Sequence, residues 1–239
     1  MSSHLDLDSS LLTYNRFLQK RHYGRRQTRS LKGNQQKLWQ DKLPNILLDL
    51  ELCRNKEFWN HHTVCLEIGF GGGEHLIHQA INHPSDYYIG CEPFVNGVAS
   101  LLQGIDQYHL NNILVYPFPV NGLLENLPDQ SIDIIFLLFA DPWPKTRHHK
   151  RRFIQESILE VVHGILKPNG IWHIATDHGE YQKWILDHFS TPKGKTFFKQ
   201  LRDDIYKRPN EQDWPKTRYE QKALNLGRQP IYLTYKKIS

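Results

Sequence analysis

The amino-acid sequence predicts an α/β protein with a doubly wound, mostly parallel sheet. Short apolar runs alternate with segments that are apolar at helical spacing, a pattern typical of strand–helix–strand units with parallel strands. The strongest of these units begins at Val64, where VCLEIGFGGGEHL leads from an apolar run through a glycine turn into a helix. Ligands of such sheets bind beyond the carboxyl ends of the strands, so we expect functional residues directly after the predicted strands.

The expected elements follow one another along the chain. Apolar runs predict strands from residue 64 into the glycine turn and over 87–91, 113–116, 132–140 and 171–175. Helical spacing is found at 35–59 (broken or restarted at Pro44), 76–81, 98–105, 153–166 and 181–189, with about two helical turns inside 117–133. A turn is expected at 167–170, and weaker strands at 197–205 and 230–235 flank a polar loop. We expect 132–140 to be a central strand and 35–59 to cover one edge of the sheet.

The glycine turn is suited to a small polar ligand. Gly69, Gly71, Gly72 and Gly73 allow backbone angles that other residues avoid, and they leave the backbone amides accessible. Glu67 stands just before them, where a carboxylate would repel phosphate but can hold an ammonium or lie near a sulfonium. The turn therefore favours a cationic ligand.

A second carboxylate narrows the identity of this ligand. The dinucleotide spacing G-x-G-x-x-G would need a glycine where this chain has Glu74. Glu92 ends the second predicted strand, roughly twenty residues beyond the glycines, where an acidic residue can accept both hydroxyls of a ribose. Together these features favour S-adenosylmethionine over NAD; a plain glycine turn with surface carboxylates is the alternative.

Composition places further limits on the protein. Its 239 residues suit one domain of ordinary size, and its three cysteines and fourteen histidines show no metal-ligand spacing, so we expect no metal. The longest apolar run, 134–140, is too short to span a membrane, and the N-terminus has no signal-peptide pattern. We expect a soluble cytoplasmic protein, either a monomer or a homodimer.

Positive charge is concentrated near the N-terminus. Residues 9–40 contain eight basic residues, Arg25 and Arg26 among them, and no acidic ones, whereas the rest of the chain has 22 basic and 25 acidic residues. Local charge of this kind is what a polyanion-binding segment needs. We expect residues 1–32 to form a flexible basic arm and residues 33–239 to form a single domain.

A second basic segment, ADPWPKTRHHKRRF, follows the predicted central strand. Asp141 and a proline-stiffened Trp143 come first, and a strip of basic residues follows: Lys145, Arg147, His148, His149, Lys150, Arg151 and Arg152. Methyltransferases of exocyclic amino groups carry an Asp/Asn/Ser-Pro-Pro-aromatic motif here, which this segment only half matches. A carboxylate beside cations favours a nucleobase substrate, with an amino group as the less favoured target.

These motifs together resemble the bacterial tRNA (guanine-N7-)-methyltransferase family. The resemblance covers YGRRQTRSLK, EIGFGGGEHL, IGCEPF, ADPWPKTRHHKRR, ATDHGEY and TRYEQKALNLG, in that order. It implies a Rossmann-like class I S-adenosylmethionine-dependent methyltransferase sheet, tRNA as the partner and modification of a guanosine in the variable loop. The implied cofactor contacts are Glu67, Gly69, Gly71, Glu92, Pro119 and Asp141, with Asp141 also catalytic. The implied guanosine contacts are Lys145, Asp177, Thr217, Arg218, Tyr219 and Glu220, and the implied RNA contacts are Arg147 to Arg152 with Arg25 and Arg26.

One position departs from the family pattern. The family usually has an Asp-Ala pair after the third strand, with the Asp near the cofactor adenine, and this chain has Pro119-Val120. Because proline offers neither a carboxylate nor an amide donor, we expect cofactor binding weaker by about 1 kcal/mol, unless Asn121 substitutes. A non-catalytic RNA-binding protein on the same fold, or a methyltransferase of a small metabolite, are the alternatives.

Overall fold

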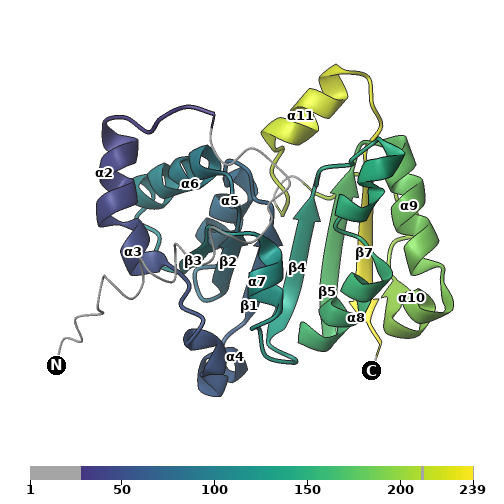
Figure 1. The fold of residues 1–239 in the computed structure, drawn as a ribbon. Coiled ribbons are helices and arrows are strands. Elements are labelled where there is room, and N and C mark those ends of the chain that lie inside the picture. Colours follow the sequence, from purple (N-terminus) through teal and green to yellow (C-terminus); the bar gives the residue numbers. More distant parts are fainter. Residues whose placement is uncertain (1–27, 211–212, 239) are drawn as a thin grey trace.

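The computed structural model describes residues 28–210 and 213–238, so Arg25, Arg26 and most of the expected basic arm lie outside the described residues. Its centre is a seven-stranded sheet of order β3-β2-β1-β4-β5-β7-β6. The strands are β1 (Val64–Ile68), β2 (Tyr87–Cys91), β3 (Ile113–Tyr116), β4 (Ile132–Leu138), β5 (Leu166–Thr176), β6 (Phe198–Gln200) and β7 (Ile231–Lys237). The first five run parallel, and β7 is antiparallel to both β5 and β6. The predicted α/β fold with a mostly parallel sheet is confirmed (Figure 1).

Helices cover both faces of the sheet. One face carries α2 (Asn34–Asp41), α3 (Leu43–Ile46), α5 (Glu74–Asn82) and α6 (Val95–Gln107), and the other carries α4 (Lys56–His61), α7 (Val120–Leu124), α8 (Glu156–Ile165) and α9 (Gly179–Phe189). The spacing of the buried residues explains this packing. In α6, Val98, Leu101, Leu102 and Ile105 recur at three and four residues and form one apolar face.

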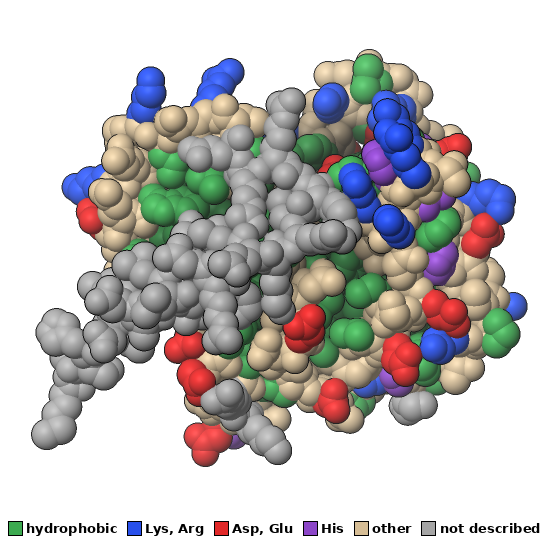
Figure 2. Space-filling model, viewed as in Figure 1, with side chains coloured by type: hydrophobic (Ala, Val, Ile, Leu, Met, Phe, Trp, Pro, Cys, Tyr) green, Lys and Arg blue, Asp and Glu red, His purple; other side chains and the backbone are tan. Residues whose placement is uncertain are grey.

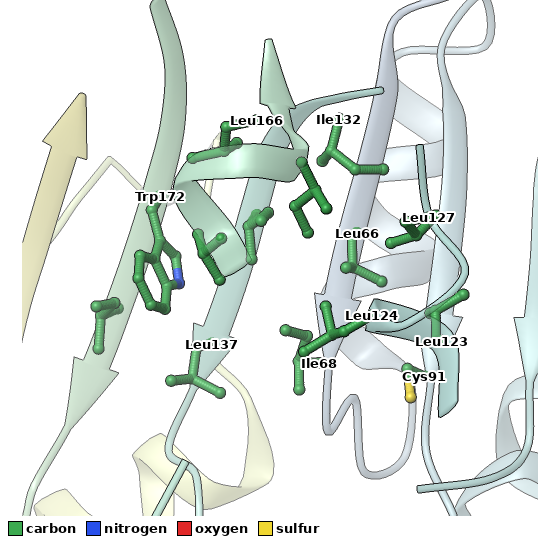
Figure 3. Packing of buried hydrophobic residues seen from close by; sticks show 14 of the residues in the cluster. Leu66, Ile68, Cys91, Leu123, Leu124, Leu127, Ile132, Leu137, Leu166 and Trp172 are labelled. Atoms are coloured by element: carbon green, nitrogen blue, oxygen red, sulfur yellow. The ribbon is translucent and has the colours of Figure 1, made fainter. Parts of the chain in front are cut away.

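Side chains alternate along β1 between two hydrophobic clusters. Val64, Leu66 and Ile68 pack with α7 and the neighbouring strands, whereas Cys65 packs on the opposite face against α5 and α6. Figure 3 shows Leu66 and Ile68 in the first of these clusters, beside Leu123 and Leu124 of α7. Successive residues of a strand point to opposite faces, so Glu67 belongs to the α5 side of the sheet.

The predicted helical segment at 35–59 is four short helices: α2, α3, the 3-10 helix η1 (Leu52–Arg54) and α4. Pro44 occupies the first turn of α3, where a missing amide hydrogen is tolerated. After α3, Leu47 bridges Val115 of β3, and the Leu48 amide donates to the Val115 carbonyl at 2.8 Å. Since β3 is an edge strand, the expected covering of one sheet edge is confirmed.

Three segments differ from the prediction. β5 starts at Leu166, and the expected turn at 167–170 is a bulge inside it, because Leu166 pairs with Ile132 while Ile171 pairs with Ile134. The strand expected at 197–205 is only β6, because α10 (Pro192–Phe197), capped by Thr191, occupies the chain before it. The expected polar loop contains α11 (Arg218–Asn225), whose residues are mostly exposed and so lack the apolar pattern of a buried helix.

The residues that the structure describes show two absences. None of their helices is both long and apolar enough to pass through a membrane. No group of three or more His, Cys, Asp or Glu side chains among them is arranged to hold a metal ion.

Candidate active site

Four acidic residues lie where neighbouring parallel strands end. Glu67 is the penultimate residue of β1, Glu92 directly follows β2, Asp141 comes three residues after β4, and Asp177 directly follows β5. Because β2, β1, β4 and β5 are adjacent and parallel, these positions share one edge of the sheet. Figure 1 shows α11 above this edge. The fold therefore gathers the predicted acidic positions on one rim.

The glycine turn between β1 and α5 reaches back to Glu92. Gly71 has a φ of 57°, which favours glycine, and its amide donates to Glu92 Oε2 at 2.9 Å. The start of α6 packs against the same turn, since a Cβ on Gly97 would lie 2.2 Å from the Gly71 carbonyl oxygen. Only a glycine at position 97 permits this approach.

Glu92 is held by main-chain amides. Its Oε1 accepts a hydrogen bond from the Phe94 amide at 3.0 Å, while Oε2 accepts from Gly71. Burial raises the pKa of Glu92 above its ordinary value, the two amides oppose this, and the charges of Asp141 and Glu67 raise it further. Each oxygen keeps a lone pair for a hydroxyl, and a cation beside these three carboxylates would be stabilised.

Glu67 is held by a histidine that the sequence analysis did not single out. The buried His75 Nδ1 lies 2.8 Å from Glu67 Oε2. Its Nε2 lies 3.3 Å from Gln79 Nε2, and Gln79 also donates to the Asp213 carbonyl. His75 and Gln79 both lie on α5, and both are buried. This polar chain links the predicted cofactor carboxylate to the loop before α11.

The loop that carries Asp141 has an unusual backbone. Phe139 and Trp143 have φ values of 54° and 43°, in the left-handed region that residues with side chains seldom adopt. The Phe139 amide donates to the Ala175 carbonyl at 2.7 Å, and Arg152 Nε donates to the Pro142 carbonyl at 2.8 Å. Both ends of the loop are thus tied to neighbouring elements.

The basic strip after this loop is the 3-10 helix η2 (Thr146–Arg151), which gives its side chains three different environments. In such a helix, residues three apart lie on the same side. Arg147 and Lys150 are exposed, whereas His148 and Arg151 both contact the ring of Trp143. The ring centroids of His148 and Trp143 are 5.8 Å apart, and Arg151 Cζ lies 5.0 Å from the Trp143 ring centroid.

The third side of η2 faces the protein. His149 and the buried Arg152, the C-cap residue directly after η2, both contact Trp184 of α9. Lys145, just before η2, is exposed like Arg147 and Lys150. Figure 2 shows Lys and Arg side chains gathered with His on the part of the surface beyond the carboxyl ends of β4 and β5. Burial and the charges of Arg151 and Arg147 lower the pKa of His148, which favours its neutral form.

The start of α11 lies against the glycine turn. A Cβ on Gly71 would lie 2.7 Å from Tyr219 Cε2, so the tyrosine ring covers this glycine, and Arg218 forms an ion pair with Glu74 at the start of α5. Burial raises the pKa of Tyr219, and Glu92 raises it further. The implied guanosine-binding segment and the implied cofactor turn are therefore in contact.

Two carboxylates near α11 are paired with arginines. Glu220 is fully buried; Arg208 donates to its two oxygens at 2.5 and 3.1 Å, and the Tyr232 hydroxyl donates to Oε1 at 2.7 Å. Asp177 Oδ2 accepts from Arg228 Nη1 at 2.8 Å, in a half-exposed pair. Neither arginine was singled out from the sequence, because an arginine in a polar loop carries no local sign of its partner.

Comparison with known proteins agrees with these features. A family model described as "Putative methyltransferase" matches residues 61–233. The tRNA (guanine-N(7)-)-methyltransferase of Ruegeria pomeroyi is 42% identical over 231 residues, covering 90% of this chain and 94% of that protein. The enzyme of the same name from Rhizobium etli is 41% identical over 221 residues, covering 90% and 95%. This chain belongs to the tRNA (guanine-N(7)-)-methyltransferase family.

Solved structures support the fold of this family member. The 16S rRNA methyltransferase KamB matches 81% of this chain and 95% of its own with a TM-score of 0.55 at 14% identity. A structure titled an antibiotic related methyltransferase matches with a TM-score of 0.51 at 18% identity. The predicted class I methyltransferase sheet is confirmed.

Several side chains for which the family resemblance implied contacts with guanosine or RNA instead form hydrogen bonds within the protein. The Thr217 side chain caps α11 by accepting from the Glu220 amide at 3.2 Å, Glu220 binds Arg208, and Arg152 binds the Pro142 carbonyl. By contrast, Lys145 and Tyr219 are exposed near the rim. Their contacts with guanosine or RNA stay predictions.

Pro119 precedes α7 and caps it without a side-chain hydrogen bond. The preceding carbonyl, of Phe118, accepts a hydrogen bond from the Cys91 thiol at 3.4 Å, so this loop lies beside the end of β2 and near Glu92. The position is therefore on the same side of the rim as Glu92, and its proline contributes no polar side-chain group there.

Proposed function

We propose that the protein transfers a methyl group from S-adenosylmethionine to the N7 nitrogen of a guanosine in the tRNA variable loop. The observation that carries this proposal is a rim on which the amide-held carboxylate of Glu92 lies beside Asp141 and a strip of exposed cations. The names of the relatives at about 40% identity support the same reaction.

The residues of the rim fit the cofactor. Glu92 has an acceptor lone pair on each oxygen for the two ribose hydroxyls, and Gly69 of the glycine turn is exposed, with open space beside it. Glu67, Glu92 and Asp141 supply negative charge where a sulfonium or ammonium would lie. When bound, S-adenosylmethionine supplies an electrophilic methyl group on a sulfonium.

Guanine N7 needs little activation by the protein. It carries an in-plane lone pair and no proton, so no strong general base is required, and the protein must orient the base and stabilise the positive charge that develops on it. Asp141, which lies at the rim between the cofactor positions and the basic strip, suits both tasks. Asp177 suits the first task, because it can orient the base by accepting from the guanine N1 and N2 hydrogens once Arg228 is displaced or shared.

The exposed cations offer a path for the tRNA backbone. Lys145, Arg147 and Lys150 lie directly after the Asp141 loop. The base of the expected arm is tied to the same rim, because Asn96, at the start of α6, accepts from the Thr28 amide at 2.9 Å and donates to the Arg29 carbonyl at 2.8 Å. We propose that arm and strip bind tRNA phosphates, so that affinity falls steeply with salt.

The test incubates the protein with labelled S-adenosylmethionine and tRNA that lacks its modifications, and then identifies the methylated nucleoside. 7-Methylguanosine is expected. The substitution Asp141→Asn should lower turnover at saturating substrates at least tenfold, about 1.4 kcal/mol of barrier. Asp187→Asn, which removes an exposed carboxylate at the far end of α9, is the matched control.

Two outcomes would overturn parts of the proposal. If tRNA binds and no methylated nucleoside forms, the protein is a non-catalytic RNA-binding member of the family. If Asp141→Asn turns over as fast as Asp187→Asn, Asp141 has only a structural role.

A further inference from the structure

Arg152 lies at the end of the basic strip and yet is inside the protein. Only 3% of its surface is exposed, whereas Arg147 and Lys150 are exposed in the same segment. The 3-10 geometry of η2 explains the difference, because Arg152 falls on the side that also carries His149 and faces α9. A tRNA phosphate therefore has no direct access to this guanidinium.

The guanidinium is fixed between aromatic rings and a carbonyl. Arg152 Cζ lies 4.8 Å from the ring centroid of Trp184 and 5.6 Å from that of Tyr181, and Nε donates to the Pro142 carbonyl at 2.8 Å. Trp184 is itself held, since its Nε1 donates to the Ile154 carbonyl at 2.7 Å. A planar guanidinium suits such a slot better than an ammonium, because it can stack on rings while donating in its plane.

The charge of Arg152 has little compensation in this slot. Among the described residues, Arg152 forms an ion pair with Glu180, whose carboxylate is 3.9 Å away and 68% exposed. Burial lowers the pKa of Arg152. A buried cation with so weak a partner costs stability.

The carbonyl that Arg152 binds belongs to the residue directly after Asp141. Pro142 has a fixed φ, Trp143 follows in the left-handed region, and Phe139 before them is left-handed too. Such a backbone persists only when its surroundings hold it. The Phe139 amide is bound by Ala175 on one side, and Arg152 supplies the corresponding bond on the other.

We propose that Arg152 is a positioning residue that holds the Asp141 loop in its active conformation, and that it makes no contact with RNA. The inference rests on the proposed function, in which Asp141 faces the target guanine. In this proposal the exposed cations of the basic strip bind tRNA, whereas the buried Arg152 acts on the reaction by positioning Asp141.

The test compares two variants that each remove one cation. Arg152→Met removes the buried cation on the side of η2 that faces the protein, and Lys150→Met removes an exposed cation on its outer side. Arg152→Met should lower turnover at saturating tRNA and S-adenosylmethionine at least tenfold and leave the dependence of tRNA affinity on salt unchanged. Lys150→Met should raise KM for tRNA and lower the slope of log affinity against log salt by about one. Lys183→Met, an exposed cation on α9, should change neither quantity.

Arg152→Lys guards against a variant that fails to fold, since it keeps the charge and loses the planar fork. It should fold, keep the salt slope and still lose turnover. The proposal is overturned if Arg152→Met or Arg152→Lys lowers the salt slope as Lys150→Met does while turnover at saturation is kept.

Hydrogen exchange separates this proposal from the proposed function. The amides of residues 139–141, Trp143 and Lys145 should exchange faster in Arg152→Met than in the wild-type protein, and unchanged exchange would overturn the inference. This result is independent of methyl transfer, so a wild-type protein that forms no 7-methylguanosine would refute the proposed function alone.

Discussion

The carboxylates on the two sides of the rim are held by different kinds of partner. On the proposed cofactor side, the main-chain amides of Gly71 and Phe94 hold Glu92. On the proposed target side, Arg208 holds Glu220 and Arg228 holds Asp177. Amides of a turn and a helix start are fixed once the sheet forms, whereas an arginine pair requires that the segment between β6 and β7 has also folded into place.

The two sides meet at the glycine turn. Tyr219 covers Gly71, and Arg218 pairs with Glu74. The start of α11, on the target side, therefore packs against the glycine turn, on the cofactor side. Breaking an arginine pair should therefore destabilise the target side strongly, and a change on the cofactor side should appear mainly in cofactor affinity.

The largest effect is expected from Glu220→Gln. Removing one charge of a buried pair leaves the other uncompensated, so the free energy of unfolding should fall by about 3 kcal/mol, measured by urea denaturation. Tyr232→Phe removes one hydrogen bond from the same carboxylate and should cost about 1 kcal/mol.

Asp177→Asn sharpens this prediction, because it removes the carboxylate of a partly exposed pair. It should cost less than about 1 kcal/mol, since solvent screens Arg228, whose side chain is 49% exposed. Equal losses for Glu220→Gln and Asp177→Asn would show that burial of the Glu220 pair does not organise the target side.

On the cofactor side, the raised pKa of Glu92 predicts pH-dependent binding. Because burial raises this pKa in the folded protein, the ionised carboxylate costs stability at neutral pH, and that cost is relieved as the pH falls through the folded pKa. The ribose hydroxyls, however, bind the ionised form better. S-adenosylmethionine affinity should therefore fall roughly tenfold as pH falls through that pKa, above the ordinary value for glutamate.

Calorimetric titration of S-adenosylmethionine at several pH values measures this effect. In Glu92→Gln, affinity should be low at neutral pH and nearly flat on acidification. A variant that keeps the wild-type pH profile would assign the titration to another group and remove Glu92 from the ribose contact.

The sequence predicted the rim well because its signals are local. Glu67, Glu92, Asp141 and Asp177 each follow an apolar run, and parallel strands bring such positions together without further information. The strands 87–91 and 113–116 were predicted with the bounds that β2 and β3 have. Alternating apolar runs are sufficient for this level of description.

The sequence could not separate the members of the basic strip. Arg147, Lys150 and Arg152 are all basic residues of one short segment, so the sequence does not distinguish them. The three-residue repeat of η2 is what places Arg152 on the side that faces the protein interior. The start of α11 did carry a usable signal, since Thr217 and Glu220 have the spacing of a capping box. Partners such as Arg208, Arg228 and His75 are set by tertiary contacts and have no local sign.

A small effect on the cofactor side is expected from Pro119→Asp, and it needs a control because the position caps α7. An aspartate there should accept a backbone hydrogen bond and raise the free energy of unfolding by up to about 1 kcal/mol without any ligand. Pro119→Asn should cap α7 equally well. If a carboxylate is what the cofactor side lacks, only the Asp variant should also bind S-adenosylmethionine more tightly, by about 1 kcal/mol or roughly fivefold. Equal affinities for the Asp and Asn variants would mean that the cofactor side, held by amides, is complete with proline at this position.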